Sequence, residues 1–468
     1  LVDETHLLIG CRLVLFAFVP LGLFEVYREQ MNTKDAFLSV FFFISVFTFF
    51  TTMLALARQQ IAEIFFVLLI LLVVDIKLDK TIKSFLLIVF GSSMAVSHYG
   101  ISYLFLLILG VSFVYILINK KRRENVRNYD LINYGVPIFL LVFIISWYMY
   151  LASSSSLESG VFVSKTIYSS ITDLFNPQTS TALNIATAKL PFLQRIDRNL
   201  YLVAEFFVLI GLLGTLIRNK KDFIPEFKIL AIGTLAISVI SIAVPKFSAA
   251  LNTDRIIHIS FFLLSPFLII GIKNCLEILN KLFKNHYKLN LKNYQKYALI
   301  FLVLFFLLNT SFLYQIIDQD KLGRFALDKS SDYMVMNGME ISAINWYNHS
   351  GNNNSEIYAD VYKQRMIYGL KFNIYEKDMT KTISMYYAEN FTENNDPNSR
   401  IEILNSFIKD GNYVFLGSFN IKNEKMRINS RRDYLDYTKS RYVYIPISDF
   451  NAVFDKIYDN GFSNLLYT

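Results

Sequence analysis

Hydrophobic residues gather in long runs along the chain, and short polar stretches separate these runs. Residues 36–57, for example, contain only apolar and small hydroxyl-bearing side chains. A helical run of about 20 such residues matches the hydrocarbon thickness of a bilayer. We therefore predict a multipass membrane protein with about ten transmembrane helices. The expected spans are residues 7–25, 36–57, 61–76, 82–96, 100–118, 131–151, 200–217, 226–245, 256–273 and 298–314.

Residues 315–468 follow a different pattern, in which short apolar stretches alternate with polar, turn-forming residues. Residues 400–420 are typical of a helix that stops near Gly411 and is followed by a strand, and residues 441–461 are typical of a strand followed by a helix. Alternating elements indicate a compact α/β domain. The predicted fold is an α-helical polytopic membrane domain, residues 1–314, followed by a small external soluble α/β domain, residues 315–468.

Basic residues in the connections indicate the orientation. Residues 119–130 contain five Lys or Arg, residues 218–228 four and residues 273–296 six. We expect these three connections to be cytoplasmic. The connection 152–199 has only four in 48 residues, so we expect it to be an external loop. Alternation along the chain then places the α/β domain outside the cell membrane as well.

The charge balance and the missing motifs exclude several function classes. The three basic connections carry +3, +2 and +5, which sum to +10, so the overall net charge of +8 reflects topology and predicts no nucleic-acid partner. Cys11 and Cys275 suggest no disulfide framework. The chain has none of the Gly-rich phosphate loops or zinc-binding motifs of soluble enzymes, and its five His are scattered. We predict no metal site; a divalent metal requirement stays open.

Four polar residues interrupt the apolar stretch "LALARQQIAEIFF", residues 54–66. They are Arg58, Gln59, Gln60 and Glu63. Gln59 and Glu63 are spaced i, i+4 and share one face of a helix. A charge deep in lipid costs at least about 2.5–3.5 kcal/mol, so such a group requires a physical reason.

The predicted topology places further polar residues at the same external level of the membrane. They are Arg12 in the first span, Ser97, His98 and Tyr99 between the fourth and fifth, Glu205 in the seventh, and Asp254, Arg255 and His258 at the start of the ninth. Their convergence predicts a protein-lined cavity that opens to the outside. Structural explanations stand beside this one: Arg12 can snorkel to the surface, Glu205 and His258 can pair with neighbours for packing, and His98 can be an inert loop residue.

Arginines beside acids at the lipid–water boundary suit chemistry on a lipid phosphate. The planar fork of arginine binds phosphate in a bidentate manner, and a carboxylate can act as a general base on an acceptor hydroxyl. This combination is what sugar transfer from a polyprenyl-phosphate carrier needs. The expected partners are membrane lipid, a polyprenyl-phosphate-linked sugar and a protein or glycan acceptor. We predict Arg58, Gln59, Gln60, Arg255, His258, Tyr99 and Arg12 as substrate-binding residues and Glu63, Asp254 and His98 as catalytic residues.

The segments "ALARQQIAEIF", "SHYGISYLF", "DRIIHISFF" and "INWYNHSG" followed by "EIYAD", in this order, resemble a family of archaeal multipass membrane proteins. That family is distantly similar to the GT-C class of lipid-linked glycosyltransferases, and the resemblance covers nearly the whole chain. It implies that Arg58 or Arg255 holds the carrier phosphate and that the C-terminal domain guides the acceptor. GT-C enzymes usually carry a catalytic acid in the first external loop. The chain begins inside or just after that loop, with Asp3 and Glu4 as its remnant, so we expect a segment upstream of Leu1.

Two other function classes stay open. A transporter of lipid or oligosaccharide would need polar residues distributed through the depth of the membrane, whereas here they gather on one side. A non-catalytic scaffold or receptor would use the external domain to bind partners and would need no polar cavity.

Overall fold

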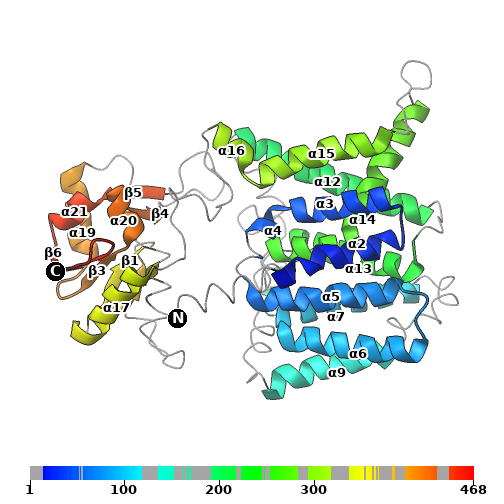
Figure 1. Ribbon diagram of the computed structural model, residues 1–468, viewed down its shortest axis with the longest axis horizontal. Helices are drawn as coiled ribbons and strands as arrows, with labels where there is room; N and C mark the ends of the chain where they lie inside the picture. The colour runs from blue at the N-terminus through cyan, green and yellow to red at the C-terminus, as the bar shows by residue number, and fades with distance from the viewer. Residues whose placement is uncertain are drawn as a thin grey trace. The chain divides into compact units, whose positions relative to one another are not determined.

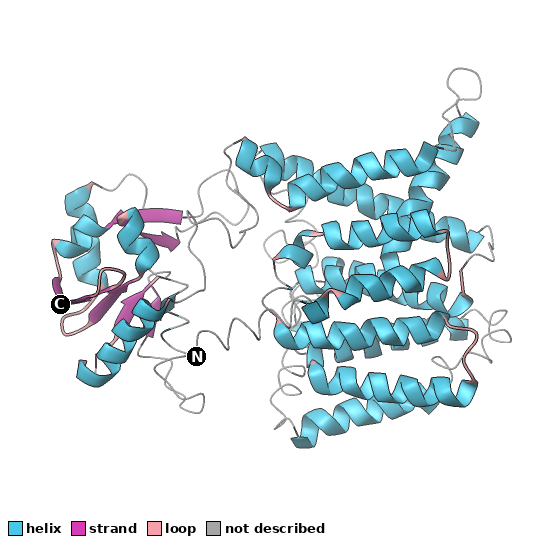
Figure 2. Cartoon of the chain, viewed as in Figure 1, coloured by secondary structure: helices cyan, strands magenta, loops and turns pink. Residues whose placement is uncertain are grey.

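The computed structural model shows a largely helical chain with a small sheet region (Figures 1 and 2). The structure describes residues 14–51, 53, 56–118, 135–151, 161, 165, 168–169, 190, 192–217, 223–244, 247, 253–282, 293–317, 337–352, 355–360, 363–364, 367, 382–384, 396–429 and 442–468. The chain divides into two compact units, a helical unit that ends at Gly323 and a mixed unit that begins at Arg324.

The helical unit contains a helix in the described part of every predicted apolar run. Its helices are α2 (Phe18–Arg28), α3 (Thr33–Ser45), α4 (Phe47–Phe50), α5 (Ala57–Val74), α6 (Lys80–Ser97), α7 (Tyr99–Ile118), α9 (Gly135–Ser146), the π-helix η2 (Trp147–Leu151), α12 (Phe192–Ile217), α13 (Pro225–Ala243), α14 (Thr253–Leu282), α15 (Tyr294–Asn309) and α16 (Phe312–Ile316). Among the described residues, α5, α6, α7, α12, α13 and α14 are six helices long and apolar enough to cross a membrane, where the sequence pattern predicted ten spans.

Helix α14 forms the centre of the helical unit. Within its apolar stretch 83% of the residues are buried, compared with 28% in α6 and α12, which therefore have large faces free to contact lipid. Aromatic side chains fill the space around α14; the rings of Phe43 and Phe262, for instance, meet edge to face with centroids 4.9 Å apart. Helices α5, α6, α7 and α9 lie side by side in Figure 1 and pack on one another.

Two glycines allow α12 and α14 to pack backbone against backbone. A Cβ atom on Gly211 would lie 1.9 Å from the carbonyl oxygen of Phe267, and a Cβ atom on Gly271 would lie 1.8 Å from that of Phe207. Only glycine fits at either position. Small residues at such contacts are typical of helices that associate in membranes, where close packing replaces the hydrophobic effect as the driving force.

The expectation of one continuous helix over 36–57 is wrong. Val46 is extended (φ −71°, ψ 136°), so α3 ends at Ser45 and α4 begins one residue later. The amide N–H of Phe47, which the break frees, donates to Tyr201 Oη and to Asn309 Oδ1, each at 3.2 Å. In a membrane such a group must find a partner within the protein. Side chains of α12 and α15 therefore make the break possible.

The mixed unit contains a five-stranded sheet of order β2-β1-β3-β7-β6, in which β1 is parallel to β2 and β3 and the other pairs are antiparallel. Strands β4 and β5 form a separate antiparallel pair. The elements are α17 (Gly338–Ser350), β1 (Ile357–Ala359), β2 (Thr382–Ser384), α19 (Pro397–Phe407), β3 (Tyr413–Leu416), α20 (Ser418–Asn423), β4 (Lys425–Asn429), β5 (Tyr442–Pro446), α21 (Ile447–Asn451), β6 (Asp455–Asp459) and β7 (Asn464–Tyr467). The helix predicted after β5 is wrong beyond Asn451, because the residues that follow pair with β7 as an edge strand.

Candidate functional site

A chain of hydrogen bonds inside the helical unit joins three helices. Thr48 Oγ1 of α4 lies 3.3 Å from His258 Nδ1 of α14, and His258 Nε2 lies 3.1 Å from Glu63 Oε2 of α5. The other carboxylate oxygen of Glu63 accepts a hydrogen bond from Gln59 Nε2 at 3.0 Å. The side chains of His258 and Glu63 are both 0% exposed. The structure thus brings together Gln59 and Glu63, which the i, i+4 spacing had paired, and His258, which was predicted at the same level of the membrane.

Local structure explains this arrangement. Gln59 and Glu63 lie in the first two turns of α5 with their i, i+4 spacing, so both side chains face inward. His258 lies in the second turn of α14, where the rings of Phe43 and Phe262 pack against it at 5.0 and 5.7 Å. Because both oxygens of Glu63 have partners and aromatic rings exclude solvent, this network holds α5 against α14 and presents no open face to a substrate.

The neighbouring glutamines are only partly satisfied. Gln60 Nε2 donates to the carbonyl oxygen of Met53 at 2.9 Å. The side-chain oxygens of Gln59 and Gln60 are buried and find no hydrogen-bond partner among the described residues. These two oxygens therefore have unused hydrogen-bonding capacity, which is uncommon for buried acceptors in proteins.

Arg58, His98 and Arg255 form a second group at the same end of the helical unit. His98 is the single residue between α6 and α7, outside both helices. Burial, together with the charges of Arg255 and Arg58, lowers the pKa of His98 to about 4, and burial is the largest of these causes. Both guanidinium groups therefore lie within electrostatic reach of the imidazole. Arg58 is exposed, and the Nε atom of Arg255 is buried without a partner among the described residues.

The tautomer of His98 follows from its hydrogen bond. Its Nδ1 atom accepts the amide N–H of Ile101 at 3.2 Å, so the proton of the neutral ring lies on Nε2. The ring of Tyr99 stacks on the imidazole with centroids 5.2 Å apart and remains 39% exposed. Two guanidinium groups and one imidazole N–H thus supply donors and positive charge to one region, which favours an anionic ligand.

Arg12 and the side chain of Asp254 lie outside the described residues. The part of the chain that the structure describes contains no group of three or more His, Cys, Asp or Glu side chains that could hold a metal ion.

Sequence reasoning missed Asp197 on α12. This carboxylate is 8% exposed, and its Oδ1 atom has no partner within the described ranges. Asp197 falls in the segment expected to be an external loop, and no sequence signal distinguished it from the other polar residues there. Thr48 was missed because a hydroxyl in an apolar run is ordinary.

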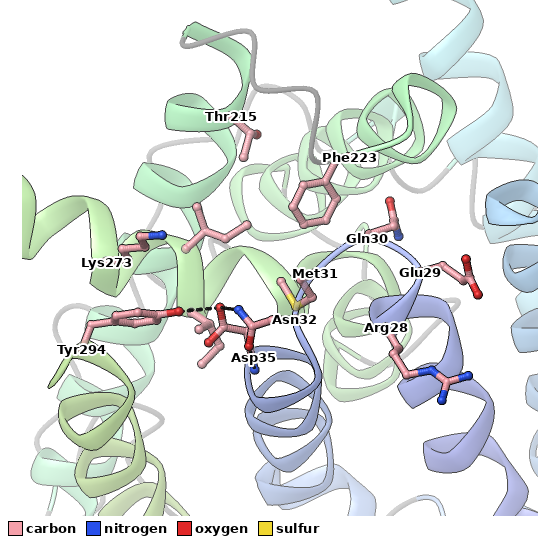
Figure 3. Close-up of a pocket in the computed structure, with 12 residues that line it drawn as sticks. Arg28, Glu29, Gln30, Met31, Asn32, Asp35, Thr215, Phe223, Lys273 and Tyr294 are labelled. Carbon is pink, nitrogen blue, oxygen red and sulfur yellow. Dashed lines mark hydrogen bonds between the residues drawn. The ribbon is translucent and has the colours of Figure 1, made fainter. Parts of the chain in front are cut away.

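A polar pocket at another end of the helical unit was also missed. Its volume is about 420 Å³, and Figure 3 shows the side chains that line it, among them Gln30, Asn32, Asp35, Lys273 and Tyr294. These residues flank connections that sequence reasoning treated as topology signals rather than as a site.

The fold and the two polar groups define a class of protein: a multipass membrane protein with a buried polar network and a small α/β unit. The chain belongs to the DUF2206 family of predicted membrane proteins, which matches residues 83–466. The prediction of a multipass membrane protein is thereby confirmed at the level of several apolar helices.

Two solved structures are weakly similar to the chain. One is the archaeal oligosaccharyltransferase AglB from Archaeoglobus fulgidus in complex with an inhibitory peptide and a dolichol-phosphate, with a TM-score of 0.39 and 11% identity over 88% of this chain. The other is the Archaeoglobus fulgidus oligosaccharyltransferase tethered to an acceptor peptide containing the NVT sequon, with a TM-score of 0.39 and 12% identity over 89% of this chain. The chain spans 58% of the length of each. No curated protein matches it.

Proposed function

We propose that this protein is a membrane glycosyltransferase that takes a sugar from a polyprenyl-phosphate-linked donor at the external face of the membrane. In this proposal the chain crosses the membrane about ten times, and residues 315–468 form an external domain that guides a protein or glycan acceptor. The orientation rests on the three basic connections, which we assign to the cytoplasm.

The observation that carries the proposal is the group of Arg58, Arg255 and His98. Three donor side chains share one region and two of them are cationic; the charges of Arg255 and Arg58 add to burial in lowering the pKa of His98. A phosphate diester at the lipid–water boundary supplies the acceptor oxygens and negative charge that this region lacks. Arg58 and Arg255 would bind the phosphate, and His98 would donate from Nε2.

The proposed reaction is a displacement at the anomeric carbon of the donor sugar. An acceptor oxygen forms the new bond to this carbon, the bond from the carbon to the phosphate oxygen breaks, and polyprenyl phosphate leaves. The acceptor proton passes to a carboxylate, for which Asp254 beside Arg255 is the candidate. Stabilising the charge that develops on the leaving phosphate is the main contribution of the two arginines.

The Glu63–His258 pair has a positioning role in this proposal. Arg58 lies five residues before Glu63 on α5, and Arg255 lies three residues before His258 on α14. The buried pair therefore fixes the separation of the two helices that carry the arginines. A catalytic group must meet the substrate, and Glu63 is fully enclosed, so we assign it to positioning rather than to proton transfer.

One observation favours a receptor or scaffold role for the mixed unit. Met339 and Phe462 expose 41% and 55% of their surfaces, and Asn460, near Phe462, donates from Nδ2 to the carbonyl oxygen of Met339 at 2.8 Å. Exposed apolar side chains that lie this close together are common at protein interfaces. This second role is compatible with an acceptor-guiding domain.

A transfer assay tests the proposed function. Purified full-length protein would be incubated with radiolabelled dolichyl-phosphate hexoses and membrane extract as the acceptor source. Arg58→Gln and Arg255→Gln should each lower transfer at least tenfold, because each removes a cation that stabilises the leaving phosphate. Lys80→Gln is the matched control, since Lys80 is exposed at the start of α6 and lies outside the proposed site. Equal transfer by all three variants and the unchanged protein would refute the proposal.

A further inference from the structure

The pocket of Figure 3 lies among α2, α3, α12, α14 and α15, all within the helical unit. A volume of about 420 Å³ is within the range of small-molecule sites, roughly 300–1,000 Å³. On α14, Lys273 of this pocket is 18 residues from Arg255, which corresponds to about 27 Å along a helix. That distance is close to the hydrocarbon thickness of about 30 Å, so the pocket is at the opposite membrane boundary from the proposed transferase site.

Several polar groups around the pocket already bind one another. Both oxygens of Asp35 accept hydrogen bonds: Oδ2 from Tyr294 Oη and Asn32 Nδ2, both at 2.6 Å, and Oδ1 from Gln295 Nε2 at 2.8 Å. Asp35 thus ties α3 to α15 and has no oxygen left without a donor. This carboxylate shapes the wall of the pocket, and its hydrogen-bond partners are already in place.

Two residues that line the pocket have hydrogen-bonding capacity that the described residues do not use. Gln30 is 5% exposed; its Nε2 atom donates to the carbonyl oxygen of Val26, and its Oε1 atom is buried without a partner among the described residues. The ammonium group of Lys273 lies 5.3 Å from the centroid of the Tyr294 ring. This contact is with the face of the ring, which leaves the N–H donors of Lys273 for an anion.

The sequence next to two helices of this pocket is rich in basic residues. The connection 218–222 has three Lys or Arg and one Asp, and the connection 283–292 has three Lys and no acid. Phe223 and Thr215, which flank the first of these connections, line the pocket. A positive potential at this boundary would draw anionic groups toward Lys273.

We propose that this pocket binds a phosphate ester that carries hydroxyl groups, as in a glycerol-phosphate headgroup. Lys273 binds the phosphate oxygens, and Gln30 Oε1 accepts a hydrogen bond from a hydroxyl of the ligand. Both a membrane lipid and a soluble phosphate ester present this chemistry. The site is separate from the proposed transferase site and does not depend on that function.

Binding measurements on the purified full-length protein in neutral detergent test this site. The probes are dihexanoyl phosphatidylglycerol below its critical micelle concentration, glycerol 1-phosphate, and glycerol as the phosphate-free control. Each is titrated by calorimetry. We expect the first probe, the second probe or both to bind and glycerol not to bind. Binding of the lipid alone identifies a headgroup in the membrane, and binding of glycerol 1-phosphate identifies a soluble ester as well.

Three variants assign the binding to the pocket. Lys273→Gln should weaken binding at least tenfold, and Lys281→Gln, on the same helix but outside the pocket, should leave it unchanged. Gln30→Met removes an unsatisfied buried acceptor, so the variant should fold normally and bind at least threefold more weakly. The inference is overturned if neither phosphate probe binds, or if Lys273→Gln and Lys281→Gln have equal affinity.

Discussion

The Glu63–His258 pair offers a direct test of how the helical unit is held together. In His258→Phe, the new ring fills the volume among Phe43, Phe49 and Phe262 but leaves Glu63 Oε2 without a donor. In Glu63→Leu, the imidazole loses its acceptor instead. Breaking a fully buried pair from either side costs about 3–5 kcal/mol, because a polar group stays buried without compensation.

The double variant removes both members of the pair, and its loss of stability should be far smaller than the sum of the losses in the two single variants. Replacing a buried pair by apolar side chains is often close to neutral, so we expect a coupling energy of at least about 2 kcal/mol. The assay is unfolding by SDS in bicelles, followed by far-UV circular dichroism. His349→Phe is the control: His349 is exposed in the mixed unit, and its replacement should change stability by less than about 0.5 kcal/mol. Additive losses in the double variant would refute the contact.

Three further predictions concern the arginine group and the helix contacts. Removing a nearby cation favours protonation of an imidazole, so Arg58→Gln should raise the pKa of His98 from about 4. NMR of labelled histidine measures this pKa, and an unchanged value would mean that Arg58 is remote from His98. The pKa of His98 is about 4 in the folded protein and 6.5 when unperturbed. The contribution of His98 to stability should therefore fall as the pH falls from about 6.5 to 4, and it should be constant above pH 7. His98→Gln should remove this part of the pH dependence of unfolding. Gly271→Ala forces a Cβ against the backbone of α12 and should prevent stable folding, whereas Gly110→Ala meets no atom within 4 Å and should be tolerated, which thermal unfolding can compare.

The hydrophobic pattern was sufficient to locate the helices of the first unit. Apolar runs bounded by polar residues have one stable form in a membrane, so length and composition decide the outcome. The same pattern does not fix the number of membrane spans, because α9 and α15 are shorter than the six helices that are long enough to cross a membrane. In the mixed unit, residues 455–459 carry too few apolar residues to separate a helix from an edge strand, and pairing with β7 decides the matter.

Contacts between distant residues limited the prediction of the site. Glu63 and His258 are 195 positions apart, and a sequence shows only that each is polar at a similar depth. The break at Val46 depends on Tyr201 and Asn309, which lie 154 and 262 positions from Phe47. No local propensity encodes such partners.

Glu63 was predicted as a catalytic residue and is assigned a positioning role in our proposal, for a related reason. Its position beside Arg58 suggested a general base, but only the three-dimensional structure shows that both of its oxygens are occupied and enclosed. The pocket around Lys273, by contrast, is a candidate site that the sequence did not indicate. Its residues come from five helices, and none of them forms a motif in the sequence.

The central claim is that Arg58, Arg255 and His98 form one site for a lipid phosphate. The dissociation constant of dolichyl phosphate, measured with purified full-length protein in nanodiscs, tests this claim most directly. We predict that Arg58→Gln and Arg255→Gln each weaken binding at least tenfold, and that the double variant weakens it by less than the product of the two single factors. Lys80→Gln, at an exposed position at the start of α6, should bind like the unchanged protein. Unchanged affinity in both single variants, or equal binding of dolichol without its phosphate, would contradict the account.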